Sequence, residues 1–204
     1  MLRITHSKNA AGAAKYFDEG LQRADYFAAE EQAIGTWGGK AAERLGLSGE
    51  VQKEEFIALC HNQKPDGSRL NPRHSNDRKV GYDFTFSVPK SVSVAYAITG
   101  NEKIRMAFEQ SVEATMQELE TNMRTQSGQG KDKKHVTTGE MIWASFTHRT
   151  SRPVDGLPDP HLTDIVLPLT LPGMNLPDVS KRENLVPLNN PLRITRPRLM
   201  RGWQ

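Results

Sequence analysis

The segment from Gly81 to Ser93, GYDFTFSVPKSVS, constrains the fold of this chain more than any other. Its first half alternates between polar and apolar residues, which is typical of a strand with one buried face. Ser87 and Pro89 then resemble the start of a helix, because serine is a favoured cap and the proline ring presets φ. We therefore predict a strand carrying Asp83 that leads directly into a helix.

The start of this predicted helix carries groups that suit a phosphate. Lys90 and Ser91 lie in its first turn, and Ser93 follows them. Free backbone N–H groups, the positive end of the helix and a lysine together favour an anion. Arg78 and Lys79, at the start of the strand, add local positive charge. An ordinary strand–turn–helix unit with a surface aspartate has the same pattern, so the residues alone leave both interpretations open.

Length and cysteine content limit the class of protein. The chain has 204 residues, enough for one domain with a sizeable core. Its mean hydropathy is −0.62, and no run is long and apolar enough to span a membrane. No cleavable signal pattern opens the chain. Cys60 is the single cysteine, which excludes an internal disulfide framework and a cysteine-based zinc site, so we expect a cytoplasmic protein.

The basic pI of about 9.0 does not by itself indicate nucleic-acid binding. Residues 1–162 contain 21 Lys and Arg and 21 Asp and Glu, so this part is formally neutral. The excess lies after Leu162, where there are six basic and three acidic residues. A basic groove would therefore have to come from local clusters, such as Arg78 and Lys79 or the run at 130–134.

The remaining pattern predicts a mixture of strands and helices. We expect strands at 2–5 and 79–87, a β-rich region at 135–151, helices at 9–16, 41–47, 51–63, 91–97 and 101–126, and polar connections at 64–79 and 127–134. The longest helix has one apolar stripe at steps of three and four residues, which we assign to the core. Six of the twelve prolines lie between Pro168 and Pro197. We therefore predict one domain at 1–162 and a poorly ordered, proline-rich basic tail at 163–204.

Tyr16 and Tyr26 each precede a phenylalanine, ten residues apart. Such residues are usually amphipathic core positions with a hydrated hydroxyl group. A tyrosine with a phenol pKa of about 10 needs a metal or a base before it can act as a nucleophile at neutral pH.

Two segments resemble the TrwC/TraI-type conjugative relaxases, the MobF family: DFTFSVPKSVS at 83–93 and WGGKAAERLGLSGEV at 37–51. The resemblance implies a two-layer α/β sandwich of the HUH type, with helices against an antiparallel sheet and a divalent metal, Mg²⁺ or Mn²⁺, on that sheet. It also implies site- and strand-specific nicking of single-stranded DNA at a plasmid transfer origin, with other relaxosome proteins as partners. Tyr16 would form the 5′-phosphotyrosyl link, Tyr26 would serve a later strand transfer, and Asp83 would orient or deprotonate a group near the metal.

The resemblance extends to ASFTHRTSRPVDGLPDPHL at 144–162, and it breaks there. In the family, one histidine on a first strand and a His-x-His pair on the next bind the metal. His148 matches the first ligand. The pair should follow Leu162, but Thr163 and Ile165 occupy its two positions, and His161 precedes the leucine.

A frameshift would explain this break. If codons from Leu162 onward are written CTG ACA GAC ATT GT, insertion of one C after CTG gives L-H-R-H-C, which restores the missing pair. A substituted site of His148, His161 and Asp164, or an unrelated new tail, are the alternatives. In the frameshifted case we expect a truncated, inactive relaxase that retains at most DNA binding, and a sheet that lacks one strand and presents an open edge.

Overall fold

The computed structural model describes residues 1–7, 35–70, 80–127, 134–154, 157–170 and 174–175. The predicted helix at 9–16 lies outside the described residues. So do four of the predicted functional residues: Tyr16, Tyr26, Arg78 and Lys79.

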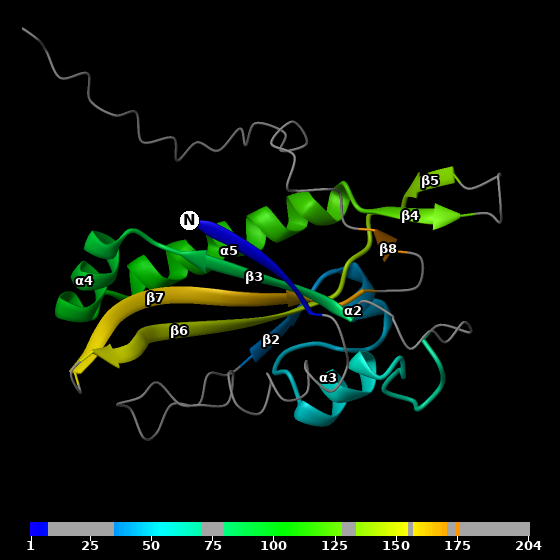
Figure 1. Ribbon diagram of the computed structural model, residues 1–204, viewed down its shortest axis with the longest axis horizontal. Coiled ribbons are helices and arrows are strands. Elements are labelled where there is room, and N and C mark those ends of the chain that lie inside the picture. Colours follow the sequence, from blue (N-terminus) through cyan, green and yellow to red (C-terminus); the bar gives the residue numbers. More distant parts are fainter. Residues whose placement is uncertain (8–34, 71–79, 128–133, 155–156, 171–173, 176–204) are drawn as a thin grey trace, which may run out of the picture.

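A five-stranded sheet with the order β1-β3-β7-β6-β2 forms the centre of the fold (Figure 1). Its strands are β1 (Leu2–Ser7), β2 (Gly35–Gly38), β3 (Gly81–Ser87), β6 (Trp143–Val154) and β7 (Leu157–Pro168). All four neighbouring pairs are antiparallel. The predicted strands at 2–5 and 79–87 and the β-rich region at 135–151 are therefore confirmed, with adjusted ends.

In the described residues four helices accompany the sheet: α2 (Lys40–Arg44), α3 (Lys53–Cys60), α4 (Lys90–Thr99) and α5 (Glu102–Thr121). A smaller sheet of β4 (Arg124–Ser127), β5 (Lys134–Thr137) and β8 (Met174–Asn175) lies at the end remote from the β6–β7 hairpin (Figure 1). Within the described residues, no helix combines the length and the apolar character needed to cross a membrane.

Each face of the sheet has its own apolar core, because successive side chains of a strand point to opposite faces. One core packs strand residues against α5 and contains Phe84, Phe86, Val112, Met116, Trp143 and Val166. The other packs strand residues against α2 and α3 and contains Ala41, Phe56, Leu59, Ala144, Phe146 and Leu167. The predicted fold of helices against an antiparallel sheet is confirmed, with α4 and α5 as the larger helical layer (Figure 1).

The long helix ends earlier than its apolar pattern predicted. Val112 and Met116 of the predicted stripe are buried, but α5 ends at Thr121 rather than at 126. The Asn122 side chain donates to the carbonyl of Glu118 at 2.9 Å and closes the last turn. Residues from Arg124 onward pair as β4 instead, because tertiary pairing outweighs a helical period that continues past a capping residue.

The expectation that the sheet would lack a strand after Leu162 is wrong. β7 continues to Pro168 and lies between β3 and β6, hydrogen-bonded to both. Val166 is fully buried and Leu167 is 6% exposed. Ile165 and Val166 are β-branched and Leu167 is apolar, which suits a central strand whatever the origin of the segment.

The segment at 37–51, which we call the 37–51 wedge, contacts both α5 and the residues just before β6. Gly39 has φ of +93°, and a Cβ there would lie 2.3 Å from the Met141 carbonyl oxygen. Glu120 of α5 is buried, and its Oε1 accepts the backbone N–H groups of Lys40 and Met141, both at 2.8 Å. Only glycine suits both the left-handed conformation and the close approach, so the motif has a clear role in the fold.

Candidate functional site

One face of the sheet carries Asp83 and His148, two of the described residues that the sequence predicted to be functional. Residues paired across antiparallel strands point to the same side. His148 of β6 pairs with Thr163 of β7, and Ile165 of β7 pairs with Thr85 of β3, so these side chains share one face. Asp83, two residues before Thr85, points the same way. We call this the His148 face, and it is opposite the face covered by α5.

Asp83 and His148 thus lie on one face with the single strand β7 between them. The Asp83 carboxylate is partly exposed and accepts a hydrogen bond from the Thr85 hydroxyl at 3.2 Å. In this position Asp83 is available to hydrogen-bond a ligand that lies on the sheet.

The two positions expected to hold the His-x-His pair are on the correct face but carry the wrong side chains. Thr163 lies directly opposite His148, and Ile165 lies two residues further along the same face. Thr163 is 6% exposed, and its hydroxyl oxygen is buried without a hydrogen-bond partner in the described structure. The part of the chain that the structure describes contains no group of three metal-ligating side chains. A three-histidine metal centre therefore does not fit the residues present.

The substituted site of His148, His161 and Asp164 is also excluded. Asp164 points to the α5 face, because it alternates with Thr163 along β7. The Ser145 hydroxyl donates to its two carboxylate oxygens, at 2.8 and 2.9 Å. Since the sheet itself separates Asp164 from His148, the two cannot hold the same ion.

Burial raises the pKa of Asp164 to about 6, from 3.8, against the opposing effect of the Ser145 hydrogen bond; nearby Glu109 also raises it. A carboxyl group with a raised pKa in the folded state loses its stabilising contribution as pH rises from about 4 through 6. Asp164→Asn should therefore stabilise the protein by up to about 3 kcal/mol at pH 8 and have little effect below pH 4. Denaturant unfolding of both proteins between pH 4 and 8 tests this, and a gain of equal size at every pH would contradict it.

The predicted phosphate site at the start of α4 is tied to β7. Lys90 forms an ion pair with Asp159 and donates to the Pro160 carbonyl at 2.8 Å, although its side chain is 52% exposed. The buried Ser93 hydroxyl oxygen accepts the Leu162 backbone N–H at 3.1 Å. Ser91 is exposed. Lys90 would therefore have to leave Asp159 before its full charge met a phosphate.

The predicted cap at Ser87 is wrong. The N-cap residue of α4 is Pro89, and no side chain caps the helix. Ser87 instead ends β3 and exchanges backbone hydrogen bonds with Met1, at 2.6 and 2.9 Å. The pairing of β1 with β3 thus continues to the first residue of the chain, and it keeps Ser87 in the sheet.

Arg3 is a candidate residue that sequence reasoning missed. It pairs with Thr85 across β1 and β3 and is exposed, so its guanidinium group belongs to the His148 face. The neighbouring Ile4 packs against the core on the α5 side. This alternation could have identified Arg3 as the outward cation of the first strand.

The two described tyrosines are poor nucleophiles. Burial raises the pKa of the Tyr82 phenol. Burial, with a hydrogen bond donated to Glu102, also raises the pKa of Tyr96. Because a raised pKa disfavours the phenolate, Tyr82 and Tyr96 are less suited than an ordinary tyrosine to act as nucleophiles.

Comparison with known proteins gives a consistent result. The TrwC relaxase family matches residues 10–171, past the boundary predicted at Leu162. The multifunctional conjugation protein TraI of Escherichia coli strain K12 is 32% identical over 172 residues, which cover 83% of this chain and 10% of that protein. A second TraI from Escherichia coli is 33% identical over 157 residues, covering 76% of this chain and 9% of that protein. The chain thus spans about a tenth of the length of these curated relatives.

Solved structures of the conjugative relaxase TrwC have the same fold. The metal-bound complex with oriT DNA has a TM-score of 0.71 and 28% identity, covering 89% of this chain and 63% of that one. TrwC complexed with a 27-mer DNA comprising the recognition hairpin and the cleavage site has a TM-score of 0.70 and 26% identity, covering 89% and 62%. The family match over residues 10–171 agrees with the antiparallel sheet and with the junction between β3 and α4. This chain belongs to the TrwC relaxase family.

Proposed function

We propose that this chain is a relaxase-type module that binds single-stranded DNA at a plasmid transfer origin and has lost the metal site needed for efficient nicking. The DNA complexes of TrwC support the choice of ligand. In the nicking reaction of the family, Tyr16 would attack the scissile phosphate, Tyr26 would serve the second transfer, and Asp83 would orient a reacting group. We also propose that it acts in the bacterial cytoplasm, alongside other relaxosome proteins.

The main observation that supports this proposal is the register between β6 and β7. It places Thr163 opposite His148 and Ile165 on the same face, so one imidazole is left where the family has three. A divalent ion held by one histidine has too few ligands for useful affinity. DNA binding depends on surface charge and shape rather than on these ligands, and it can outlast their loss.

A paired assay of binding and cleavage tests the proposal. The chain is incubated with a transfer-origin oligonucleotide and Mg²⁺ or Mn²⁺, and binding is followed by anisotropy while cleavage is followed on a denaturing gel. We expect binding without a covalent protein–DNA product. If a product forms with the unaltered chain and disappears with Tyr16→Phe, the chain is an active relaxase and the loss of nicking is disproved. Absence of any binding above a scrambled oligonucleotide would disprove the DNA-binding role.

Arg3→Ala should weaken the binding of single-stranded DNA several-fold at low salt. If Arg3 contacts a phosphate, removing it lowers the slope of log K against log salt by about 0.7, the value for one contact with a single strand. Titrations at several salt concentrations measure this slope. Lys103→Ala is a matched control, since Lys103 is exposed on α5, beyond the opposite face of the sheet. Equal effects of the two substitutions would contradict a role for Arg3 on the His148 face.

The proposed frameshift is tested by the nucleotide sequence of the gene across codons 158–175, read from independently prepared DNA. We expect one of the alternative frames to encode His-x-His followed by further relaxase sequence. If no frame encodes it, the segment after Leu162 is the true continuation of the gene, and the metal site was lost by substitution.

A further inference from the structure

The α5 face of β7 buries a carboxylate beside other carboxylates. Asp164 is 2% exposed, and both Glu109 and Glu113 of α5 act on it as like charges. Its contacts are the Ser145 hydroxyl and the backbone N–H of Phe146. Within the described residues, no lysine or arginine forms an ion pair with Asp164. A buried charge without a counter-charge is unfavourable, so this position requires an explanation.

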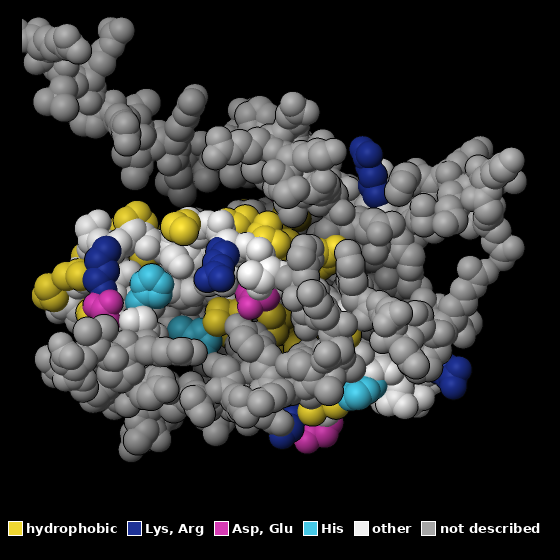
Figure 2. Space-filling model, viewed as in Figure 1, with side chains coloured by type: hydrophobic (Ala, Val, Ile, Leu, Met, Phe, Trp, Pro, Cys, Tyr) yellow, Lys and Arg dark blue, Asp and Glu magenta, His cyan; other side chains and the backbone are white. Residues whose placement is uncertain are grey.

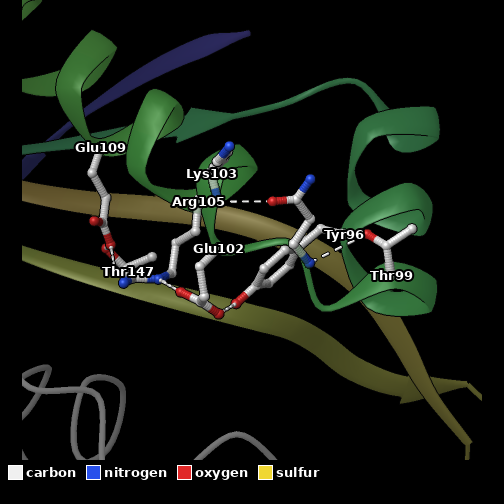
Figure 3. Close-up of polar contacts among 8 residues, drawn as sticks. Tyr96, Thr99, Glu102, Lys103, Arg105, Glu109 and Thr147 are labelled. Atoms are coloured by element: carbon white, nitrogen blue, oxygen red, sulfur yellow. Dashed lines mark hydrogen bonds and ion pairs between the residues drawn. The ribbon is translucent and has the colours of Figure 1, made fainter.

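Two other acidic residues of α5, Glu102 and Glu109, have arginines beside them. Arg105 contacts Glu102 and Glu109, each at 2.5 Å, and the Thr147 hydroxyl donates to Glu109 at 3.4 Å (Figure 3). The other nearby cation, Arg149, acts on Glu102. Glu102 and Glu109 are therefore neutralised by α5 itself and by β6.

Glu113 lies one turn beyond Glu109 and lacks such a cation. Gln117 donates an amide hydrogen bond to it at 2.9 Å, and the described residues provide no ion pair for it. Glu113 is exposed, whereas Asp164 lies beneath α5 in the sheet. A long basic side chain from position 164 could keep its stem buried and extend its charge towards Glu113 at the edge of the helix.

We infer that position 164 is built for a basic side chain, which Glu113 would bind, and that Asp164 reverses the charge this position requires. A basic residue there would be a positioning residue. It would attach β7 to α5 from one face and so hold positions 163 and 165 on the other. This inference concerns the charge of the folded chain and does not depend on the proposed function.

The inserted-base reading L-H-R-H-C places an arginine between the two histidines, at position 164. The three consecutive positions then fit their surroundings: the histidines fall on the His148 face, and the arginine falls on the face with the α5 carboxylates. With the codons written above, the frameshift would therefore supply the basic side chain that the α5 face favours.

Thermal unfolding of the full chain at pH 7.5 tests this inference. Asp164→Arg should raise Tm by at least about 3 °C more than Asp164→Asn, because the arginine adds an ion pair to the removal of a buried acid. In the Asp164→Arg background, Glu113→Gln should reduce the difference in Tm between the arginine and asparagine variants. An asparagine variant as stable as a folded arginine variant would overturn the inference, as would a gain that Glu113→Gln leaves unchanged.

A second variant decides the question if Asp164→Arg does not fold. Glu113→Lys supplies the cation from an exposed helix position while Asp164 is retained. It should raise Tm by about 2–4 °C, and this rise should vanish in the Asp164→Asn background. Gln110→Lys, also exposed on α5, is the control and should leave Tm unchanged. A rise that persists without Asp164, or no rise at all, would overturn the inference.

Discussion

Thr163→His combined with Ile165→His should turn this chain into a metal-binding protein. The two substitutions place imidazoles beside His148 on one face of neighbouring strands, at the positions that the β6–β7 register defines. Three imidazoles with an open fourth position suit a divalent transition metal. At a metal concentration 100 times the dissociation constant, the gain in stability is about 2.7 kcal/mol, or roughly 5–10 °C in Tm. Thermal unfolding with and without Mn²⁺ or Ni²⁺ measures it.

The matched control for this variant is Thr163→His combined with Asp164→His. It adds the same number of histidines but sends one of them to the α5 face, so we expect no comparable rise in Tm. If both double variants respond equally to metal, the face assignment is wrong. If the unaltered chain already gains several degrees, its metal site is intact in a form that the described residues do not include.

The same variant should also gain nicking activity. A metal that stabilises charge in the transition state contributes several kcal/mol, which corresponds to more than about 100-fold in rate. The covalent product with a transfer-origin oligonucleotide should therefore rise by at least that factor over the unaltered chain and disappear with Tyr16→Phe. A metal-binding variant that forms no product would show that more than the ligand pair has been lost.

Glu120→Ala should strongly destabilise the protein. The buried Glu120 Oε1 accepts two backbone N–H groups, from Lys40 and from Met141, and so joins α5 to the 37–51 wedge and to the residues before β6. Its removal leaves the Met141 N–H without a partner in a buried site and the Lys40 N–H without a partner in a partly buried one, at a cost of about 2–4 kcal/mol. Denaturant unfolding measures the loss as a lower midpoint with an unchanged slope.

Glu120→Gln is the control for this prediction, because an amide oxygen still accepts hydrogen bonds. It should retain much more of the stability than alanine does. Glu118→Ala, on a more exposed side of the same helix, should change stability by less than about 0.5 kcal/mol. Equal losses for Glu120→Gln and Glu120→Ala would mean that the charge, rather than the two hydrogen bonds, stabilises this junction.

Local patterns in the sequence predicted several of the described elements and the family correctly. The alternation at Gly81–Ser87 and the apolar stripe of α5 arise from the periods of strand and helix, so they can be read without a structure. The motifs at 37–51 and 83–93 identified the relaxase family because each is a contiguous stretch of sequence that can be compared directly. The break in the resemblance after Leu162 was visible in the same way.

The consequence of that break was decided by the tertiary structure. The missing histidine pair predicted that the sheet would lack a strand, yet β7 continues to Pro168, because pairing on both sides and burial of Val166 stabilise an apolar segment in the sheet. Burial and strand pairing depend on neighbours that are distant in sequence, so composition could not predict them.

The sequence also could not predict on which face of the sheet each side chain lies. The chain alone determined which side chains are available: His148, Thr163, Asp164, Ile165 and the acidic residues of α5. Strand register and the position of α5 determined that Thr163 and Ile165 lie with His148, while Asp164 lies beneath Glu109 and Glu113. A sheet separates the side chains of adjacent residues onto opposite faces, and only long-range pairing decides which groups each of them meets.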